Sequence, residues 1–176
     1  MFQSTVRNDI GFGVVGELAF EGPLNAQPAI LNSADAANNV FGRAFTHLAA
    51  EGQVTAGGAG VFAGILANPK EHANRGTLAG GTLADSLVLP NGIIASFVQE
   101  TPGIIVTLPA GDVNIGDQVI YATATGILDT QAPGTAPGAG NALIPGATVV
   151  RYEKSATAGL AVIALKGPML GTAAPV

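Results

Sequence analysis

The sequence predicts an all-β fold, an antiparallel β-barrel or jelly-roll-like sandwich of about eight to ten short strands with an extended N-terminal arm. Two observations support this prediction. Glycine and proline supply 25 and 11 of the 176 residues, a content typical of many short strands joined by turns. Apolar runs rich in β-branched residues alternate with these turns through the second half of the chain. We expect an arm over residues 1–28, a β domain over 29–168 and a flexible tail over 169–176.

The first 28 residues favour an extended arm because their glycines and prolines allow no long helix or strand. Apolar side chains are nevertheless frequent in this segment. We therefore expect the arm to pack, either on its own β domain or on another subunit. The residues that interrupt regular structure here are Gly11, Gly13, Gly16, Gly22, Pro23 and Pro28.

The stretch NSADAANNVFGRAFTHLAAEG, residues 32–52, fits two templates. One is a helix with Ser33 as its N-cap and an apolar face. The other is a helical turn near 34–38 followed by a strand over about 40–47. We favour the second, because the proposed helix would contain several poor helix formers, namely Asn38, Asn39, Gly42 and Thr46.

The middle of the chain contains three further strand signals. GVFAGILANPK, residues 60–70, is typical of a buried strand interrupted at Gly64 by a bulge or a close backbone approach. SLVLPNGIIASFV, residues 86–98, shows two apolar runs around Asn91-Gly92, a pair that favours a tight turn. GIIVTLP, residues 103–109, is β-branched and ends at a proline.

The last third predicts two strand pairs and one long loop. Residues 115–130 indicate a strand, a turn containing Gly126 and a second strand. Residues 147–155 and 159–167 form another pair of apolar runs. Between the pairs, TQAPGTAPGAGN (130–141) carries two prolines, three glycines and no charge, so it predicts an exposed loop.

One motif has the spacing of a nucleotide-binding turn, but the residues around it do not support nucleotide binding. Gly11, Gly13 and Gly16 have the spacing G-x-G-x-x-G of a dinucleotide-binding turn. That turn needs a helix of ten or more residues after the glycines, whereas this segment breaks at Gly22-Pro23. Asp35 lies where a ribose-binding acid would be expected, but the unit around it is not βαβ. We expect no bound cofactor and no small-molecule ligand.

No pattern of titratable residues indicates catalysis. His47 and His72 lack the spacing of metal-ligand motifs, and no serine lies in G-x-S-x-G. Asp112 and Asp117 favour ordinary turn chemistry, with a calcium site as a weaker alternative. We therefore predict that the protein is not an enzyme and has no catalytic, cofactor-binding or metal residues.

Composition points to a protein that acts through contact area. Charged residues make up only 11% of the chain and hydrophobic residues 48%, so the surface is poorly protected against association. The net charge of −5 and the scattered cations argue against nucleic-acid binding. There is no cysteine, and no apolar run approaches the length of a membrane span. The N-terminal MFQSTVRNDI lacks the pattern of a secretory signal, so we expect synthesis in the cytoplasm.

Several stretches, in order and spanning most of residues 11–165, resemble the structural cement (head-decoration) proteins of tailed bacteriophages. They are GFGVVGELAFEGPLNAQPAILNSADAANNVFGRAFT, GVFAGILANPKEHA, and NIGDQVIYATATGIL followed by VVRYEKSATAGLAVIAL. The resemblance implies a small β-rich protein on the outer surface of the capsid, made in the bacterial host. It implies that the protein clamps neighbouring major capsid subunits and helps the head to resist the pressure of packaged DNA.

The resemblance also implies self-association, as a dimer or trimer, and gives no ligand or active-site residue. An alternative is another β-structured virion or surface-binding module, such as a tail component or a glycan-binding domain. The low aromatic content of 5% disfavours the glycan-binding reading. Our candidate interface residues come from the arm and the proline-rich loop: Phe2, Phe12, Val14, Leu18, Phe20, Pro133 and Pro137.

Overall fold

The computed structural model describes residues 13–68, 88–109, 113–152 and 159–167, and within them the chain is all-β, as predicted. Nine strands form one sheet, and Ala36–Asn38 forms a single 3₁₀ turn. No helix in these ranges is long and apolar enough to cross a membrane. The strands are β1 (Asn25–Leu31), β2 (Ala44–His47), β3 (Gln53–Ala56), β4 (Phe62–Leu66), β5 (Ile94–Leu108), β6 (Gln118–Ala122), β7 (Leu128–Gln131), β8 (Asn141–Tyr152) and β9 (Gly159–Lys166).

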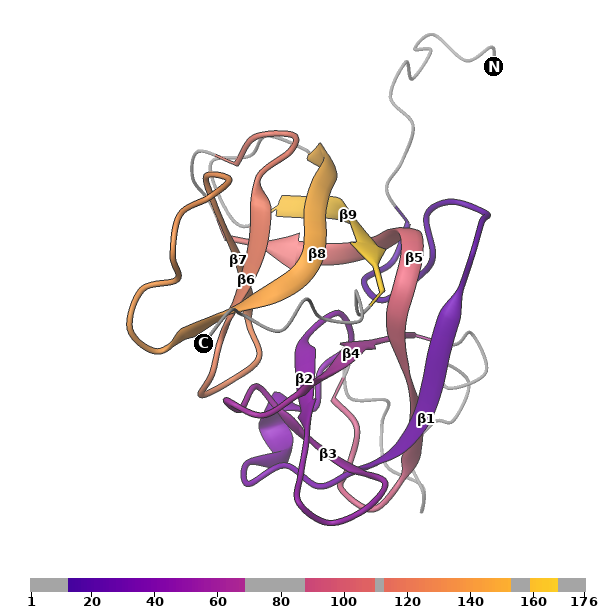
Figure 1. Ribbon diagram of the computed structural model, residues 1–176. Helices are drawn as coiled ribbons and strands as arrows, with labels where there is room; N and C mark the ends of the chain where they lie inside the picture. Colours follow the sequence, from indigo (N-terminus) through magenta and orange to yellow (C-terminus); the bar gives the residue numbers. More distant parts are fainter. Residues whose placement is uncertain (1–12, 69–87, 110–112, 153–158, 168–176) are drawn as a thin grey trace, which may run out of the picture.

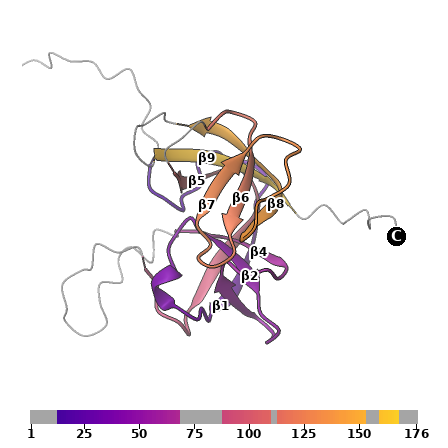
Figure 2. The same ribbon diagram turned by 90° about the vertical axis from the view of Figure 1, so that its left-hand side faces the viewer.

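The sheet has two halves that share β5. Its strand order is β1-β3-β2-β4-β5-β9-β8-β6-β7, with an additional pairing between β1 and β5. This extra pairing closes β1 to β5 into a hydrogen-bonded ring of five strands. Figure 1 shows β1 to β4 in the lower part of the molecule, β6 to β9 in the upper part and β5 running through both, and Figure 2 shows the same division from the side. All of these pairings are antiparallel except that of β1 with β3.

Strand β5 is longer than the sequence indicated. We expected separate runs at 86–98 and 103–109, whereas β5 continues from Ile94 to Leu108. Its pairing with β9 shifts register between Thr101 and Ile104. Pro102 lies inside this shift, where the missing N–H of proline costs no regular ladder hydrogen bond. The predicted turn at Asn91-Gly92 is present and leads into β5.

Each half has its own hydrophobic cluster, and β5 contributes to both. In the ring, Leu31, Val54 and Leu66 surround Phe45 and Phe97, whose ring centroids lie 5.1 Å apart. In the other half, side chains from β5 to β9 pack together, and Ala44 of β2 and Ile65 of β4 join this cluster from the ring. Large members of this second cluster with 2% exposure or less are Ile65, Val98, Ile104, Val106, Leu108, Val119, Tyr121, Leu128, Ile144, Val149, Ile163 and Leu165.

The turn after β6 fastens the two halves together. Ala44 N donates to Gly126 O at 2.9 Å, and Gly58 N donates to Thr123 O at 2.7 Å. Gly126, at φ +72°, ends the turn in which we predicted it. Residues 132–140 form an exposed loop, as predicted, and β8 begins at Asn141, six residues before the strand we expected there.

Residues 32–52 follow the second of the two templates. Asp35 caps the 3₁₀ turn by accepting from Ala37 N at 3.0 Å. The strand that follows is shorter than expected and covers Ala44–His47. Gly64 has φ +139° within β4, and the β2–β4 register shifts beside its partner Phe45. This irregularity is the bulge that the interrupted apolar run predicted.

The segment we expected to be an arm, residues 1–28, divides into parts. Residues 25–28 are the first residues of β1 and pair with β5. Residues 13–24 lie beside β5 and are described below. Residues 1–12 and the tail 169–176 lie outside the described ranges.

Candidate contact surface

Residues 13–24, which we call the strap, run along β5 in the half that also pairs with β9. Gly16 N donates to Ile105 O at 2.7 Å, Ile105 N to Glu17 O at 2.9 Å and Ala19 N to Gly103 O at 2.9 Å. Leu18 and Ile104 form an antiparallel bridge. The strap therefore occupies the edge of β5 opposite β9, and its backbone is held by the molecule's own sheet.

Gly13 and Gly16 of the G-x-G-x-x-G motif lie in the described residues, and Gly16 has a clear structural role. Gly16 follows Val15 in a turn, has φ +87° and packs so closely that an added Cβ would lie 2.8 Å from Asn68 N. Glu17 N donates to Val14 O at 3.1 Å, and Glu17 Oε2 accepts from Val14 N at 3.2 Å. No helix follows this turn, so the helix terminus that would bind a pyrophosphate does not form.

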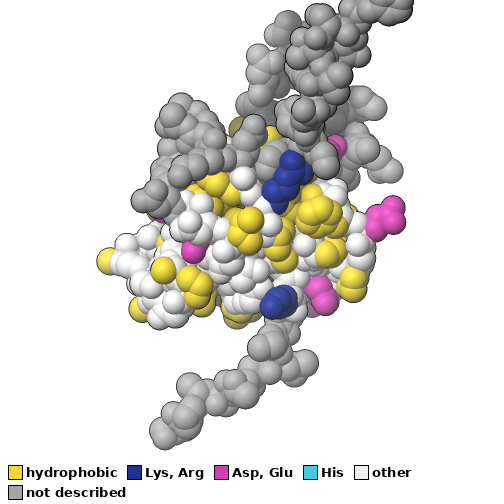
Figure 3. All heavy atoms as spheres, turned by 90° about the horizontal axis from the view of Figure 1, so that it is seen from above, with side chains coloured by type: hydrophobic (Ala, Val, Ile, Leu, Met, Phe, Trp, Pro, Cys, Tyr) yellow, Lys and Arg dark blue, Asp and Glu magenta, His cyan; other side chains and the backbone are white. Residues whose placement is uncertain are grey.

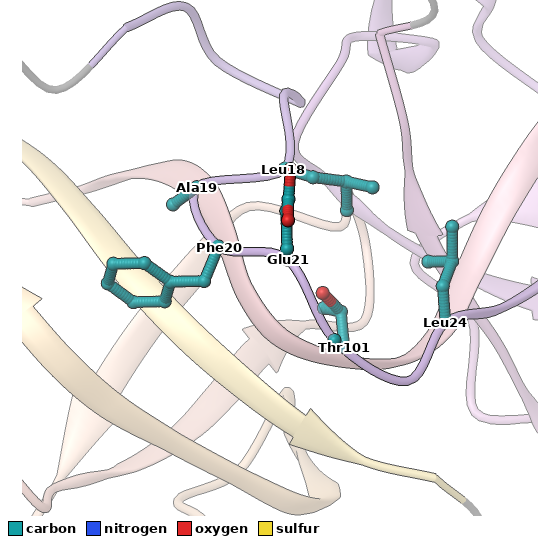
Figure 4. A pocket seen from close by; sticks show the side chains of 7 residues that line it. Leu18, Ala19, Phe20, Glu21, Leu24 and Thr101 are labelled. Carbon is teal, nitrogen blue, oxygen red and sulfur yellow. The ribbon is translucent and has the colours of Figure 1, made fainter.

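The side chains of the strap leave apolar surface exposed. Leu18, Phe20 and Leu24 are 44%, 47% and 51% exposed. Together with Ala19, Glu21 and Thr101 they line an open hollow of about 330 Å³, shown in Figure 4. Apart from the Glu21 carboxylate and the Thr101 hydroxyl, the side chains around it are hydrocarbon. Such a lining is suited to an apolar side chain of another protein and offers few groups to orient a polar ligand.

Charged side chains are sparse on the top of the molecule as Figure 1 draws it. Figure 3, which looks down on the top of the molecule in Figure 1, shows hydrophobic side chains gathered on this face with only a few charged groups among them. This face matches the low charge content of the sequence. A surface of this kind favours burial against protein.

The candidate interface residues fall into separate places. Val14, Leu18 and Phe20 lie together on the strap, with Val14 46% exposed. Pro133 is exposed and Pro137 half-buried in the loop after β7, on the β6–β7 side of the molecule and away from the strap (Figure 1). That loop is anchored at Thr135 O, which accepts from Gln118 Nε2 at 2.6 Å and from Gln131 Nε2 at 2.6 Å. Phe2 and Phe12 lie outside the described residues.

Sequence reasoning missed other exposed apolar side chains. Leu24 completes the hollow, and Ile30 and Ile94 face each other across the β1–β5 pair with 37% and 64% exposure. Leu24 could have been found from its place in the same apolar segment as Leu18. Ile30 and Ile94 could not, because their pairing joins segments far apart in the chain.

Titratable side chains in the described ranges do not converge on a common site. No group of three His, Asp or Glu residues there could hold a metal ion. Asp117 accepts from Asn114 N at 2.8 Å in the turn before β6, and His47 is exposed on β2. His72 and Asp112 lie outside the described residues.

Two pKa values are shifted, and both shifts have structural causes. Burial lowers the pKa of Arg43, and Asp35 partly opposes this effect. The Arg43 guanidinium donates to Asn38 Oδ1 at 2.7 Å. Burial raises the pKa of Tyr121, whose hydroxyl donates to Gly58 O at 3.2 Å. Arg43 thus contacts the 3₁₀ turn, Tyr121 connects β6 to the segment after β3, and neither side chain lines the hollow.

Comparison with known proteins adds two findings. The family described as "Structural cement protein (E217 gp24/Pam3 gp6)" matches residues 2–166. Four chains of solved structures match, one of them in a structure titled "The capsid of Myoviridae Phage XM1". That chain superposes with a TM-score of 0.53 at 14% identity, over 94% of this chain and 97% of its own, which shows a shared fold. Among curated proteins there is no match.

Proposed function

The chain belongs to the phage structural cement protein family, and from this premise we propose that it binds the outer surface of an assembled bacteriophage capsid and clamps neighbouring major capsid subunits. A structural role in the virion follows from the family. The observation that carries the proposal is the family match over residues 2–166, and the capsid neighbour supports it. In this role the protein stabilises the DNA-filled head and catalyses no reaction.

In the proposed arrangement the nine strands act as a barrel-like body and the N-terminal residues as an arm. The closed ring of β1 to β5 supports the first part. The hydrogen bonds between the strap and β5 begin at Gly16. Residues 1–12, which include Phe2 and Phe12, extend the contact to a neighbouring capsid subunit. The partner is the major capsid protein, and copies of the chain self-associate as dimers or trimers.

The hollow of the strap takes an apolar side chain of the capsid. Complete burial of a large apolar side chain contributes about 1.5–3 kcal/mol, and Leu18, Phe20 and Leu24 are each about half exposed. The strap alone is smaller than the roughly 1,600 Å² of an ordinary stable interface. The residues before the strap and the loop at Pro133 and Pro137 supply the remaining area. Because many copies bind one shell, modest affinity at each contact is sufficient.

A co-sedimentation experiment tests this function. Purified protein is mixed with undecorated, expanded heads of its phage, and the particles are separated from the soluble fraction. We expect saturable binding to expanded heads and no binding to free capsid subunits, because the clamp requires neighbouring subunits in place. Protein that stays in the soluble fraction at micromolar concentration contradicts the proposal. An unrelated β protein of similar size controls for trapping in the pellet.

A further inference from the structure

Asn91-Gly92 is the only Asn-Gly pair in the sequence. Asparagine followed by glycine is chemically labile, because the glycine backbone nitrogen meets no side chain when it attacks the asparagine carboxamide. In this protein the pair lies in the turn before β5, and Gly92 has φ +86° with open space around its Cα. The turn geometry explains why the Asn-Gly pair is present. Its resistance to this reaction must come from other contacts.

Hydrogen bonds hold both reacting groups. Asn91 Oδ1 accepts from Ser33 N at 3.0 Å and from Asn39 Nδ2 at 2.8 Å, and Asn91 Nδ2 donates to Ser33 O at 2.8 Å. The nucleophile is held as well, because Gly92 N donates to Leu31 O at 2.7 Å. The nitrogen cannot reach the Asn91 Cγ while these bonds persist.

The network that holds Asn91 is itself buried. Asn39 is 0% exposed and Ser33 4% exposed. Asn39 Nδ2 also donates to Leu89 O at 3.0 Å, and Ser33 Oγ donates to Asn39 Oδ1 while accepting from Ala56 N at 2.8 Å. These bonds connect the turn to the end of β3, so the turn opens only when part of the ring loosens.

We propose that Asn91 is a modification site at which spontaneous deamidation is controlled by the opening of this network. After the turn opens, Gly92 N loses its proton to water and bonds to the Asn91 Cγ. The Cγ–Nδ2 bond breaks, and the nitrogen leaves as ammonia with a proton returned from water. Water then adds to either carbonyl of the five-membered succinimide and opens it to aspartate or isoaspartate.

The change is one-way because the ammonia is lost, and the product no longer fits the site. In an aspartate, a carboxylate oxygen takes the place of Nδ2, which lies 2.8 Å from Ser33 O. Two acceptors then face each other where a hydrogen bond had been, which is unfavourable at a partly buried site. Isoaspartate adds a carbon to the turn backbone and displaces Gly92. Either product weakens the attachment of the turn to the ring.

The test is peptide mapping by mass spectrometry of the full-length protein during incubation at mildly alkaline pH. We expect deamidation at Asn91 to be at least about tenfold slower in the native protein than in the same chain held in urea, because only the open fraction reacts. Equal rates in the two states overturn the proposal.

Two variants separate local from global opening. Asn39→Ala removes two donors of the network, and Val149→Ala creates a cavity in the other hydrophobic cluster. We expect severalfold faster deamidation in Asn39→Ala and an unchanged rate in Val149→Ala. Equal rates in the two variants overturn local control. If Asn39→Ala does not fold, Ser33→Ala, which keeps the backbone bonds to Asn91, replaces it with the same expectation.

Discussion

At the scale of single residues, the strap packs on β5 through Phe20, whose side chain fits only because residue 103 is a glycine. Phe20 lies over Gly103, where an added Cβ would come within 2.5 Å of the ring and 2.8 Å of Val162 Cγ1. Gly103 does not have a positive φ, so its requirement for glycine is one of space. The Cδ2–Cε2 side of the Phe20 ring thus lies against Gly103, while 47% of the residue is exposed.

Gly103→Ala should therefore lower the free energy of unfolding by about 1–3 kcal/mol, because the new methyl group must displace Phe20 or Val162. Urea denaturation measures the change. The matched control is Gly138→Ala, which has neither a positive φ nor a neighbour within 4 Å and should be neutral or slightly stabilising.

A double-mutant cycle with Phe20→Ala identifies the contact. In the Phe20→Ala background, Gly103→Ala should lower the free energy of unfolding by less than it does in the wild type. The clash with Val162 accounts for the loss that remains. Additive effects of the two substitutions would contradict the assigned contact between Phe20 and Gly103.

At this scale the sequence nominated residues for contact but did not predict their positions. The apolar character of Leu18 and Phe20 was enough to nominate them for contact, and the poor context of the glycine triplet was enough to discount it. The contact of Phe20 with Gly103 could not be predicted, because Gly103 lies far along the chain. The structure thus gives Phe20 an intramolecular contact beside its proposed intermolecular one.

At the scale of elements, the strap is a component of the sheet as well as a candidate contact. It occupies an edge of β5 with three backbone hydrogen bonds and lies beside the buried Ile105. A free β edge with exposed N–H and C=O groups is prone to unwanted pairing. The strap protects β5 from such pairing while it presents apolar side chains outward.

Two truncations separate these roles. Deletion of residues 1–24 should lower the free energy of unfolding by about 2–4 kcal/mol, because it removes the bonds to Gly103 and Ile105 and uncovers apolar surface. Deletion of residues 1–12 removes none of the described contacts and should change stability by less than about 0.5 kcal/mol. Thermal unfolding measures both.

Binding of the shorter truncation to heads completes the comparison. Because Phe2 and Phe12 are proposed to contact the capsid, deletion of residues 1–12 should weaken co-sedimentation while the melting temperature stays near that of the full chain. Full binding by this variant would exclude these residues from the interface. A large loss of stability would mean that they belong to the core.

Local patterns predicted most elements, and tertiary pairing determined the rest. The β6–β7 and β8–β9 pairs were readable because in each pair two apolar runs lie close together in the sequence. β5 was divided in our prediction because Pro102 and Gly103 resemble a break in the sequence, whereas a register shift accommodates both. The early start of β8 was hidden by Pro145 and Gly146, which lie inside that strand.

At the scale of the whole molecule, the all-β class followed from composition, but the ring did not. Its closure needs β1 to pair with β5 and also, in parallel, with β3. These contacts join distant segments, and no local signal encodes them. Two hydrophobic clusters around one shared strand are the result.

The proposed contact surface makes a prediction at this scale. Leu24→Ala removes exposed apolar area from the hollow and should weaken binding to heads by about 1 kcal/mol per copy, or roughly fivefold, with little change in melting temperature. Ile115→Ala, at a 75% exposed residue between β5 and β6, is the matched control and should bind as the wild type does. Titration of labelled protein onto heads measures both, and equal weakening would argue against the strap as the contact.

The shared strand has a mechanical consequence. A pull applied to the ring passes into the other half through the covalent backbone of β5, without crossing an interface that could peel open. Along much of its length β5 is flanked on both sides, by β1 and β4 in the ring and by the strap and β9 beyond it, so tension along it loads many hydrogen bonds at once in shear. When internal pressure expands the capsid, tension on the bound protein would therefore load both halves together.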